Sequence, residues 1–251
     1  MALPEPTAQD RPDLPGYAPR LLGAAFLIVI LTSLIGGVLQ NSAVGTGSIS
    51  DILRGAAQGT TLLRASVLID LVTTLGIVVM AALLYRVLSG QHKVIALVAM
   101  GCWLAEALFM AISKIGTLAL IPVSQAFVGA GTPESSAYQP LGEFLYQGLV
   151  KNGYTFHMFF YCSGGILWYS LLYRSRYVPR AISLFGLVAV VVALAGIVVE
   201  LSGSSVPMIA YLPLLPFELT IGTWLLLRGI ATSTSMSRVR RVGPALRSGP
   251  A

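Results

Sequence analysis

The sequence predicts an all-α protein, a polytopic bundle of helices that cross a membrane. Of its 251 residues, 55% are hydrophobic and only 10% are charged, whereas soluble domains contain about 25% charged residues. The mean hydropathy is +0.80. Apolar runs recur along the chain, several of them long enough to cross a bilayer core, which needs about 20 helical residues. These observations exclude an ordinary soluble domain.

The apolar runs divide the chain into a transmembrane domain and two tails. Residues 1–19 are rich in Pro, Asp and Glu and lack the features of a signal peptide, so we expect a disordered tail. Residues 231–251 predict a second disordered tail, which is basic. Between them, residues 20–230 contain six expected spans, which lie at 21–39, 62–88, 94–120, 154–173, 181–201 and 208–230.

Two of the connections between these spans are long enough to have a structure of their own. Residues 51–58 suit a short interfacial helix, and residues 122–140 suggest a loop whose only charged residue is Glu134. Pro213 and Pro216 stand inside the sixth run, and we expect them to kink that helix near Glu218.

The distribution of Lys and Arg predicts the orientation of the bundle. Twelve of the sixteen basic residues fall in the two tails and in the second and fourth connections. Arg54 and Arg64 lie on the opposite side. Because basic residues concentrate on the cytoplasmic side of membrane proteins, we expect six spans with both termini in the cytoplasm.

Three acids inside the spans are the candidate catalytic groups. A charged side chain at the centre of a membrane helix costs roughly 2.5–3.5 kcal/mol on insertion scales. Asp70, Glu106 and Glu218 therefore need a partner, a proton or a cavity. All three fall near the midplane or on its outer side, and His157 lies at a similar level. We expect these four residues to share a polar cavity that opens outward.

The same cavity is expected to bind the substrate through neighbouring aromatic and polar residues. These candidates are Trp103, Tyr154, Trp224, Lys151 and Asn152.

Each candidate also has a structural interpretation. Glu106 can be a polar packing residue that pairs with a cation such as Lys151, and His157 can be a hydrogen-bonded core histidine. The other histidine, His92, lies in an inner turn, so we expect no metal site and no cofactor. The formal charge of +6 sits in loops and tails, where it suits anionic lipid better than nucleic acid.

Several segments resemble a bacterial family of multi-pass membrane proteins known only as a domain of unknown function of about two hundred residues. The matching segments are RLLGAAFLIVILTSLIGG at 20–37, LYRVL at 84–88, WYSLLYRSRYVPRAISLFGLV at 168–188 and FELTIGTWLLLRGI at 217–230. The resemblance implies six helices in a bacterial inner membrane. It implies no particular activity, and it aligns the acid of the last segment with Glu218.

Three functions are compatible with this pattern. The first is an intramembrane enzyme acting on a lipophilic, isoprenoid-like substrate, because an acid in a low-dielectric cavity tends to keep its proton and can donate it. Glu218 or Asp70 would be the donor and Glu106 its partner, which requires the three acids to converge. A proton-initiated terpene cyclase is one form of this enzyme, since small membrane cyclases are similar in size and helix count.

The second function is a small transporter that uses the acids for proton or cation coupling. The third is a non-catalytic membrane subunit in which the acids join helices. In every case membrane lipid is an expected partner.

Overall fold

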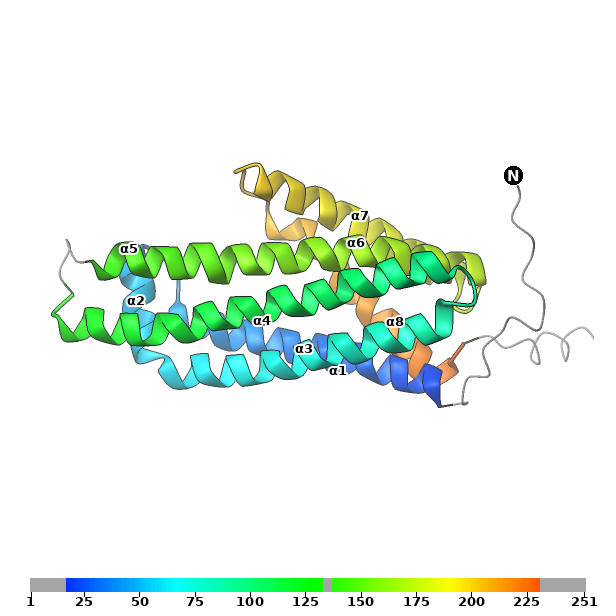
Figure 1. Cartoon of the computed structure of the whole chain (residues 1–251), viewed down its shortest axis with the longest axis horizontal. Coiled ribbons are helices and arrows are strands. Elements are labelled where there is room, and N and C mark those ends of the chain that lie inside the picture. Colours follow the sequence, from blue (N-terminus) through cyan, green and yellow to red (C-terminus); the bar gives the residue numbers. More distant parts are fainter. Residues whose placement is uncertain (1–16, 133–136, 231–251) are drawn as a thin grey trace, which may run out of the picture.

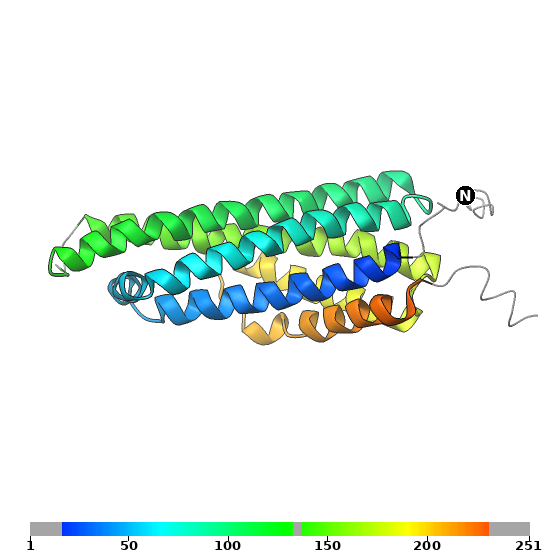
Figure 2. The ribbon, with the colours of Figure 1, turned by 90° about the horizontal axis from the view of Figure 1, so that it is seen from below.

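The computed structural model describes residues 17–132 and 137–230, and within these ranges it contains helices and turns but no β-strand. The expected all-α fold is therefore confirmed. Six long helices run back and forth along one axis (Figures 1 and 2). They are α1 (Ala18–Val44), α3 (Thr60–Leu88), α4 (Lys93–Gly129), α6 (Asn152–Ser175), α7 (Arg180–Leu201) and α8 (Leu214–Arg228).

Four of these helices, α1, α3, α4 and α7, are long and apolar enough to cross a membrane. The protein is therefore a membrane protein. The expected tails fall largely on residues 1–16 and 231–251, which lie outside the described residues.

The six helices form a closed ring. Each packs against two neighbours in the order α1, α3, α4, α6, α7, α8, and α8 returns to α1. Neighbours in this ring are antiparallel, so the α3–α4 and α6–α7 turns lie at the same end as the start of α1 and the end of α8 (Figure 1). We call this the basic end, since Arg20, Arg86, Lys93, Arg174, Arg176, Arg180 and Arg228 lie there.

The helices of the ring differ greatly in length. At 1.5 Å per residue α4 is about 55 Å long, whereas α7 is about 33 Å and α8 about 22 Å long. A second long rod packs against α4. It consists of the short helix α5 (Tyr138–Glu143), a π-helix η2 (Phe144–Lys151) and α6, which continue into one another. As a result α3, α4 and this rod extend beyond α7 and α8 at the end opposite the basic end (Figure 1).

This extension has its own small hydrophobic core. The helix α2 (Ile49–Gln58) lies across it and buries Ile52, Leu53 and Ala56. At its start, the Ser48 hydroxyl and the Asp51 carboxylate form a capping box. The hydrogen bonds from the Ser48 hydroxyl and amide hold the pKa of Asp51 below its ordinary value.

Two local expectations were wrong. The expected loop at 122–140 is helical at both ends, because α4 continues through Pro122 to Gly129 and α5 begins at Tyr138. The proline ring is on the exposed side, while Leu120, Ser124 and Phe127 continue the buried face. The expected sixth run, 208–230, is a 3-10 turn η3 (Met208–Ala210) followed by α8. Pro213 caps α8 and Pro216 lies in its first turn, where proline needs no kink.

Glycines allow α1 and α8 to approach closely. A Cβ atom at Gly23 would overlap the backbone of Gly222 and Leu226, and one at Gly222 would lie 2.9 Å from the side chain of Leu27. This contact fixes α8 against α1 and so fixes the position of Glu218. Small residues of this kind are the usual basis of close helix packing in membranes.

The Gly23 contact gives a test of the ring. We expect Gly23→Ala to lower the free energy of unfolding by about 1 to 3 kcal/mol, because the new methyl group must push two backbones apart. The control is Gly37→Ala on the same helix, where a Cβ atom meets nothing within 4 Å. Thermal unfolding in detergent would compare the two variants, and equal melting temperatures would contradict the proposed packing role.

Candidate functional site

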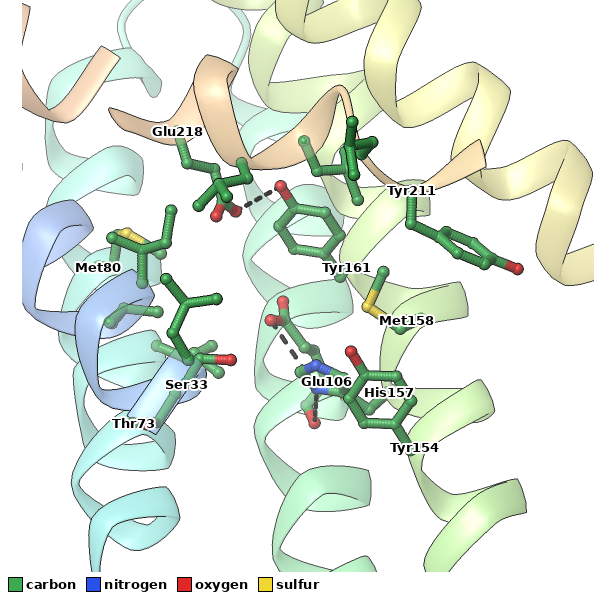
Figure 3. A pocket seen from close by; sticks show the side chains of 17 residues that line it. Ser33, Thr73, Met80, Glu106, Tyr154, His157, Met158, Tyr161, Tyr211 and Glu218 are labelled. Atoms are coloured by element: carbon green, nitrogen blue, oxygen red, sulfur yellow. Dashed lines mark hydrogen bonds and ion pairs between the residues drawn. The ribbon is translucent and has the colours of Figure 1, made fainter. Parts of the chain in front are cut away.

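A cavity of about 280 Å³ lies inside the ring, between α1, α3, α4, α6 and the start of α8 (Figure 3). Most of its wall is apolar. Its polar lining groups are Ser33, Thr73, Glu106, Tyr154, His157, Tyr161, Tyr211 and Glu218. Volumes of about 300–1,000 Å³ are typical of small-molecule sites, so the cavity suits a small ligand or part of a larger one.

One face of α6 provides the aromatic side of the cavity. His157, Met158 and Tyr161 lie three, four and seven residues after Tyr154, so the four side chains share one face of the helix. The Tyr154 ring lies against the imidazole of His157, with ring centroids 5.4 Å apart. Figure 3 shows this row beside the carboxyl group of Glu106.

Glu106 comes from α4 and meets His157. The Nδ1 atom of His157 lies 4.0 Å from Oε1 of Glu106 and 3.4 Å from its main-chain oxygen. The other carboxyl oxygen, Oε2, has no hydrogen-bond partner among the described residues. Glu106 lines the cavity and is only 3% exposed, so this oxygen is a buried acceptor without a partner. An unpaired buried polar atom is unusual and calls for an explanation.

Glu218 comes from α8 and meets Tyr161. The Tyr161 hydroxyl donates a hydrogen bond of 2.5 Å to Oε1 of Glu218. Figure 3 shows the carboxyl group of Glu218 beside the Tyr161 ring and that of Glu106 below the ring. Two acids from different helices therefore share one mostly apolar cavity.

Behind this lining, an aromatic cluster closes the cavity toward the basic end. The rings of Trp103 and Tyr161 are stacked with centroids 6.1 Å apart, and the indole N–H of Trp103 donates to the main-chain oxygen of Tyr161 at 3.2 Å. Phe26 and Trp168 pack edge-on against the same indole. All four rings are buried.

At its other side the cavity is open. Four of its lining residues are exposed, namely Leu34 on α1, Tyr154 on α6, and Leu212 and Leu215 around the start of α8. The opening is thus a lateral one between α1, α6 and α8. Its rim is apolar apart from the phenol of Tyr154.

Asp70 does not line the cavity, contrary to the expected convergence of three acids. Its carboxylate accepts from the Lys114 ammonium at 2.7 Å, and both side chains are buried. Lys114 also donates to Gln40 at 2.9 Å. This ion pair therefore joins α1, α3 and α4, and Gly36 makes room for the Asp70 carboxylate on α1.

Four expected substrate-binding residues also lie elsewhere. Trp103 is fully buried behind Tyr161, and Trp224 lines a separate shallow groove with Arg228. Lys151 and Asn152 are exposed at the far end, where the Lys151 ammonium lies 5.3 Å from the ring centre of Tyr146 and makes no pair with Glu106. Of the nine candidates, the cavity brings together Glu106, Tyr154, His157 and Glu218.

Two tyrosines that shape the cavity are not among the residues expected from the sequence. Tyr161 is the hydrogen-bond donor to Glu218, and the spacing from Tyr154 and His157 is the signal that could have found it. Tyr211 lies before α8, and its hydroxyl donates to Glu200 at 2.8 Å, which ties the cavity wall to α7. No periodic pattern in the sequence indicates Tyr211.

Comparison with known proteins supports the resemblance seen in the sequence. Residues 21–229 match the family described as Domain of unknown function (DUF4386). The chain belongs to this family. None of the curated proteins and none of the solved structures matches the chain. The matched range, 21–229, contains the whole cavity lining and the Asp70–Lys114 pair.

The Asp70–Lys114 pair can be separated experimentally from the cavity acids. We expect Lys114→Met to destabilise the protein by about 3 to 5 kcal/mol, because it leaves the Asp70 carboxylate buried without a cation. The double variant Asp70→Asn/Lys114→Met should recover much of this loss, since no unpaired charge remains.

The matched control is the exposed pair of Asp51 and Arg54, whose atoms are 3.1 Å apart. Arg54→Met should change stability by less than about 1 kcal/mol, as exposed pairs do. Thermal unfolding of all four proteins measures the effect. Equal losses for Lys114→Met and the double variant would argue against a structural ion pair.

Proposed function

We propose that this DUF4386 protein is an intramembrane acid–base enzyme that acts on a lipophilic substrate. The observation that carries the proposal is the pair of carboxyl groups, Glu106 and Glu218, which face one mostly apolar cavity with a lateral opening. An acid in such surroundings can hold and deliver a proton where water would otherwise compete. The apolar rim suits a substrate that arrives from lipid.

We further propose that all six long helices of the ring span a bacterial inner membrane, α6 and α8 included, with the basic end in the cytoplasm. The seven basic residues of that end support this orientation. At 1.5 Å per residue, Glu218 then lies about 15 Å from Arg228 and Glu106 about 20 Å from Lys93. Both acids are near the middle of a hydrocarbon core about 30 Å thick, and the opening faces the outer leaflet.

The roles of the cavity residues follow from their contacts. Tyr161 holds one oxygen of Glu218 and leaves the other free, so we assign Glu218 as the proton donor. Glu106 is its partner, since its free Oε2 can accept a proton or stabilise positive charge. His157 orients Glu106 through Nδ1. Asp70 has no role in this scheme, because it pairs with Lys114 outside the cavity. The enzyme with three convergent acids that the sequence suggested is thus ruled out, and the proposal rests on Glu106 and Glu218 alone.

The proposal does not extend to terpene cyclisation. The two tryptophans that were expected to line a substrate cavity, Trp103 and Trp224, do not line this one, and its acids and tyrosines do not distinguish a cyclase from other acid–base enzymes. Transport is the weaker alternative, because the cavity opens on one side and the buried rings of Phe26, Trp103 and Trp168 fill the ring below it. A transporter would need a second arrangement in which this cluster separates.

Reporter insertions test the orientation. We expect alkaline phosphatase inserted after Gly203 to be active, since this loop would lie outside the cytoplasm, and the same insertion after Ser89 to be inactive. Green fluorescent protein at the two positions should give the opposite pattern. Phosphatase activity at Ser89 would contradict the proposed topology.

Metabolite extraction tests the enzyme. Lipophilic extracts of cells that express the wild type or Glu218→Gln would be compared by mass spectrometry at matched protein levels. We expect a product of the wild type to fall by a factor of about 100 or more in Glu218→Gln, as for loss of a general acid. The product should fall less in Tyr161→Phe, because the carboxyl group of Glu218 remains.

The control variant is Glu143→Gln, an exposed acid far from the cavity, which should leave the product unchanged. Identical extracts from wild type and Glu218→Gln would argue against the proposed enzyme and in favour of transport or a structural role.

A further inference from the structure

We infer that the ligand of this cavity is a lipophilic amine, a molecule with an apolar chain and one ammonium group, which enters from the outer leaflet. The inference rests on the proposed function in taking the cavity as the substrate site, and it adds the chemical class of the substrate. It follows from the charges of the lining, the unpaired oxygens, the aromatic rings and the opening.

The lining has acids but no base stronger than histidine. Among the described residues no Lys or Arg lines the cavity. The nearest buried cation on α4, Lys114, is held by Asp70 and Gln40 at 2.7 and 2.9 Å. A phosphate, diphosphate or carboxylate group would therefore meet Glu106 and Glu218 without a countercharge, and its burial would be very costly. Anionic ligands, prenyl diphosphates among them, are excluded.

The unpaired oxygen of Glu106 calls for a hydrogen-bond donor. Oε2 of Glu106 is buried and has no partner, and Glu218 accepts one hydrogen bond, at Oε1. An ammonium group carries three N–H donors and one positive charge. With three donors it can serve more than one acceptor, and its charge neutralises one acid, whereas an alcohol has a single O–H and no charge. Buried charges are tolerated when they are paired and hydrogen-bonded in this way.

The aromatic rings favour the same ligand. The rings of Tyr154 and Tyr161 line the cavity above and below Glu106 (Figure 3). The faces of such rings attract cations, with a gain of about 2 kcal/mol where water is excluded. Carboxylates combined with aromatic faces are the general solution for binding an ammonium group.

The opening explains where the apolar chain of the ligand lies. A cavity of about 280 Å³ can hold a head group with a short stretch of chain, while the exposed apolar rim of Leu34, Leu212 and Leu215 leaves the remainder in contact with lipid. This arrangement limits recognition to the head group and tolerates chains of different length.

Native mass spectrometry of the full-length protein in lipid nanodiscs tests the inference with three probes of equal chain length, decylamine, decanol and decanoate. We expect one decylamine per chain, bound at least tenfold more tightly than either other probe. Glu106→Gln should weaken decylamine at least tenfold and leave decanol unchanged. Glu143→Gln is the matched control and should bind as the wild type does.

A second variant protects the test against misfolding of Glu106→Gln. Leu215→Trp enlarges an exposed rim residue, so folding should be unaffected, and we expect it to reduce decylamine binding by narrowing the opening. Equal binding of decanol or decanoate would overturn the inference, as would full decylamine binding by both variants.

The outcomes also separate this inference from the proposed enzyme. Selective decylamine binding without any Glu218-dependent product would support the amine site and reject the enzyme. A Glu218-dependent product together with unselective binding would reject the amine site alone.

Discussion

The cost of placing a carboxyl group inside a membrane governs this structure. Three acids lie within the helical ring, and each meets that cost in a different way. Asp70 is neutralised by a buried ammonium group, and Glu218 accepts a short hydrogen bond from a tyrosine. Glu106 has a histidine at 4.0 Å and keeps one oxygen unpaired. The carboxyl group of Asp70 is thus the best paired of the three and that of Glu106 the least. The two acids with fewer partners are the ones that line the cavity. Buried polar groups that a protein leaves incomplete are those for which a ligand can provide the missing partner.

Much of the fold could be predicted because apolar length is a strong signal in membrane proteins. The helices α3 and α7 begin or end within two residues of the expected spans. The continuation of α4 beyond Pro122 was missed because proline was taken as a boundary, although Leu120, Ser124 and Phe127 keep the helical period through it. The ring order could not be predicted. It depends on close contacts such as Gly23 against Gly222, and a single sequence does not show which glycines face each other.

The site was partly predictable for a similar reason. An acid in an apolar run is conspicuous, so Glu106 and Glu218 could be found, but Asp70 looks the same in the sequence. The difference between Asp70 and the other two acids is its contact with Lys114. This lysine follows Glu106 by eight residues on α4, but its ammonium group pairs with Asp70 on α3. Tyr161 could not be singled out in the same way, because a tyrosine in an apolar helix, unlike an acid, needs no charged partner. Trp103 was expected to be a wall and instead supports one, since its indole stacks behind Tyr161.

The position of the cavity follows from the unequal lengths of the helices. Where all six are present, aromatic and aliphatic side chains fill the ring completely, and Trp103, Trp168 and Phe217 are fully buried. Toward the other end α7 and α8 are absent, while α1, α4 and α6 continue. The cavity forms at this transition. Tyr211, Leu212 and Leu215 line it around the start of α8, and in the described part of the chain no helix continues α8 beyond them. An acid at the start of a short helix is thereby both deep in the bundle and accessible from its side. A longer α8 would close the opening, so the brevity of this helix is as much a part of the site as the carboxyl group of Glu218.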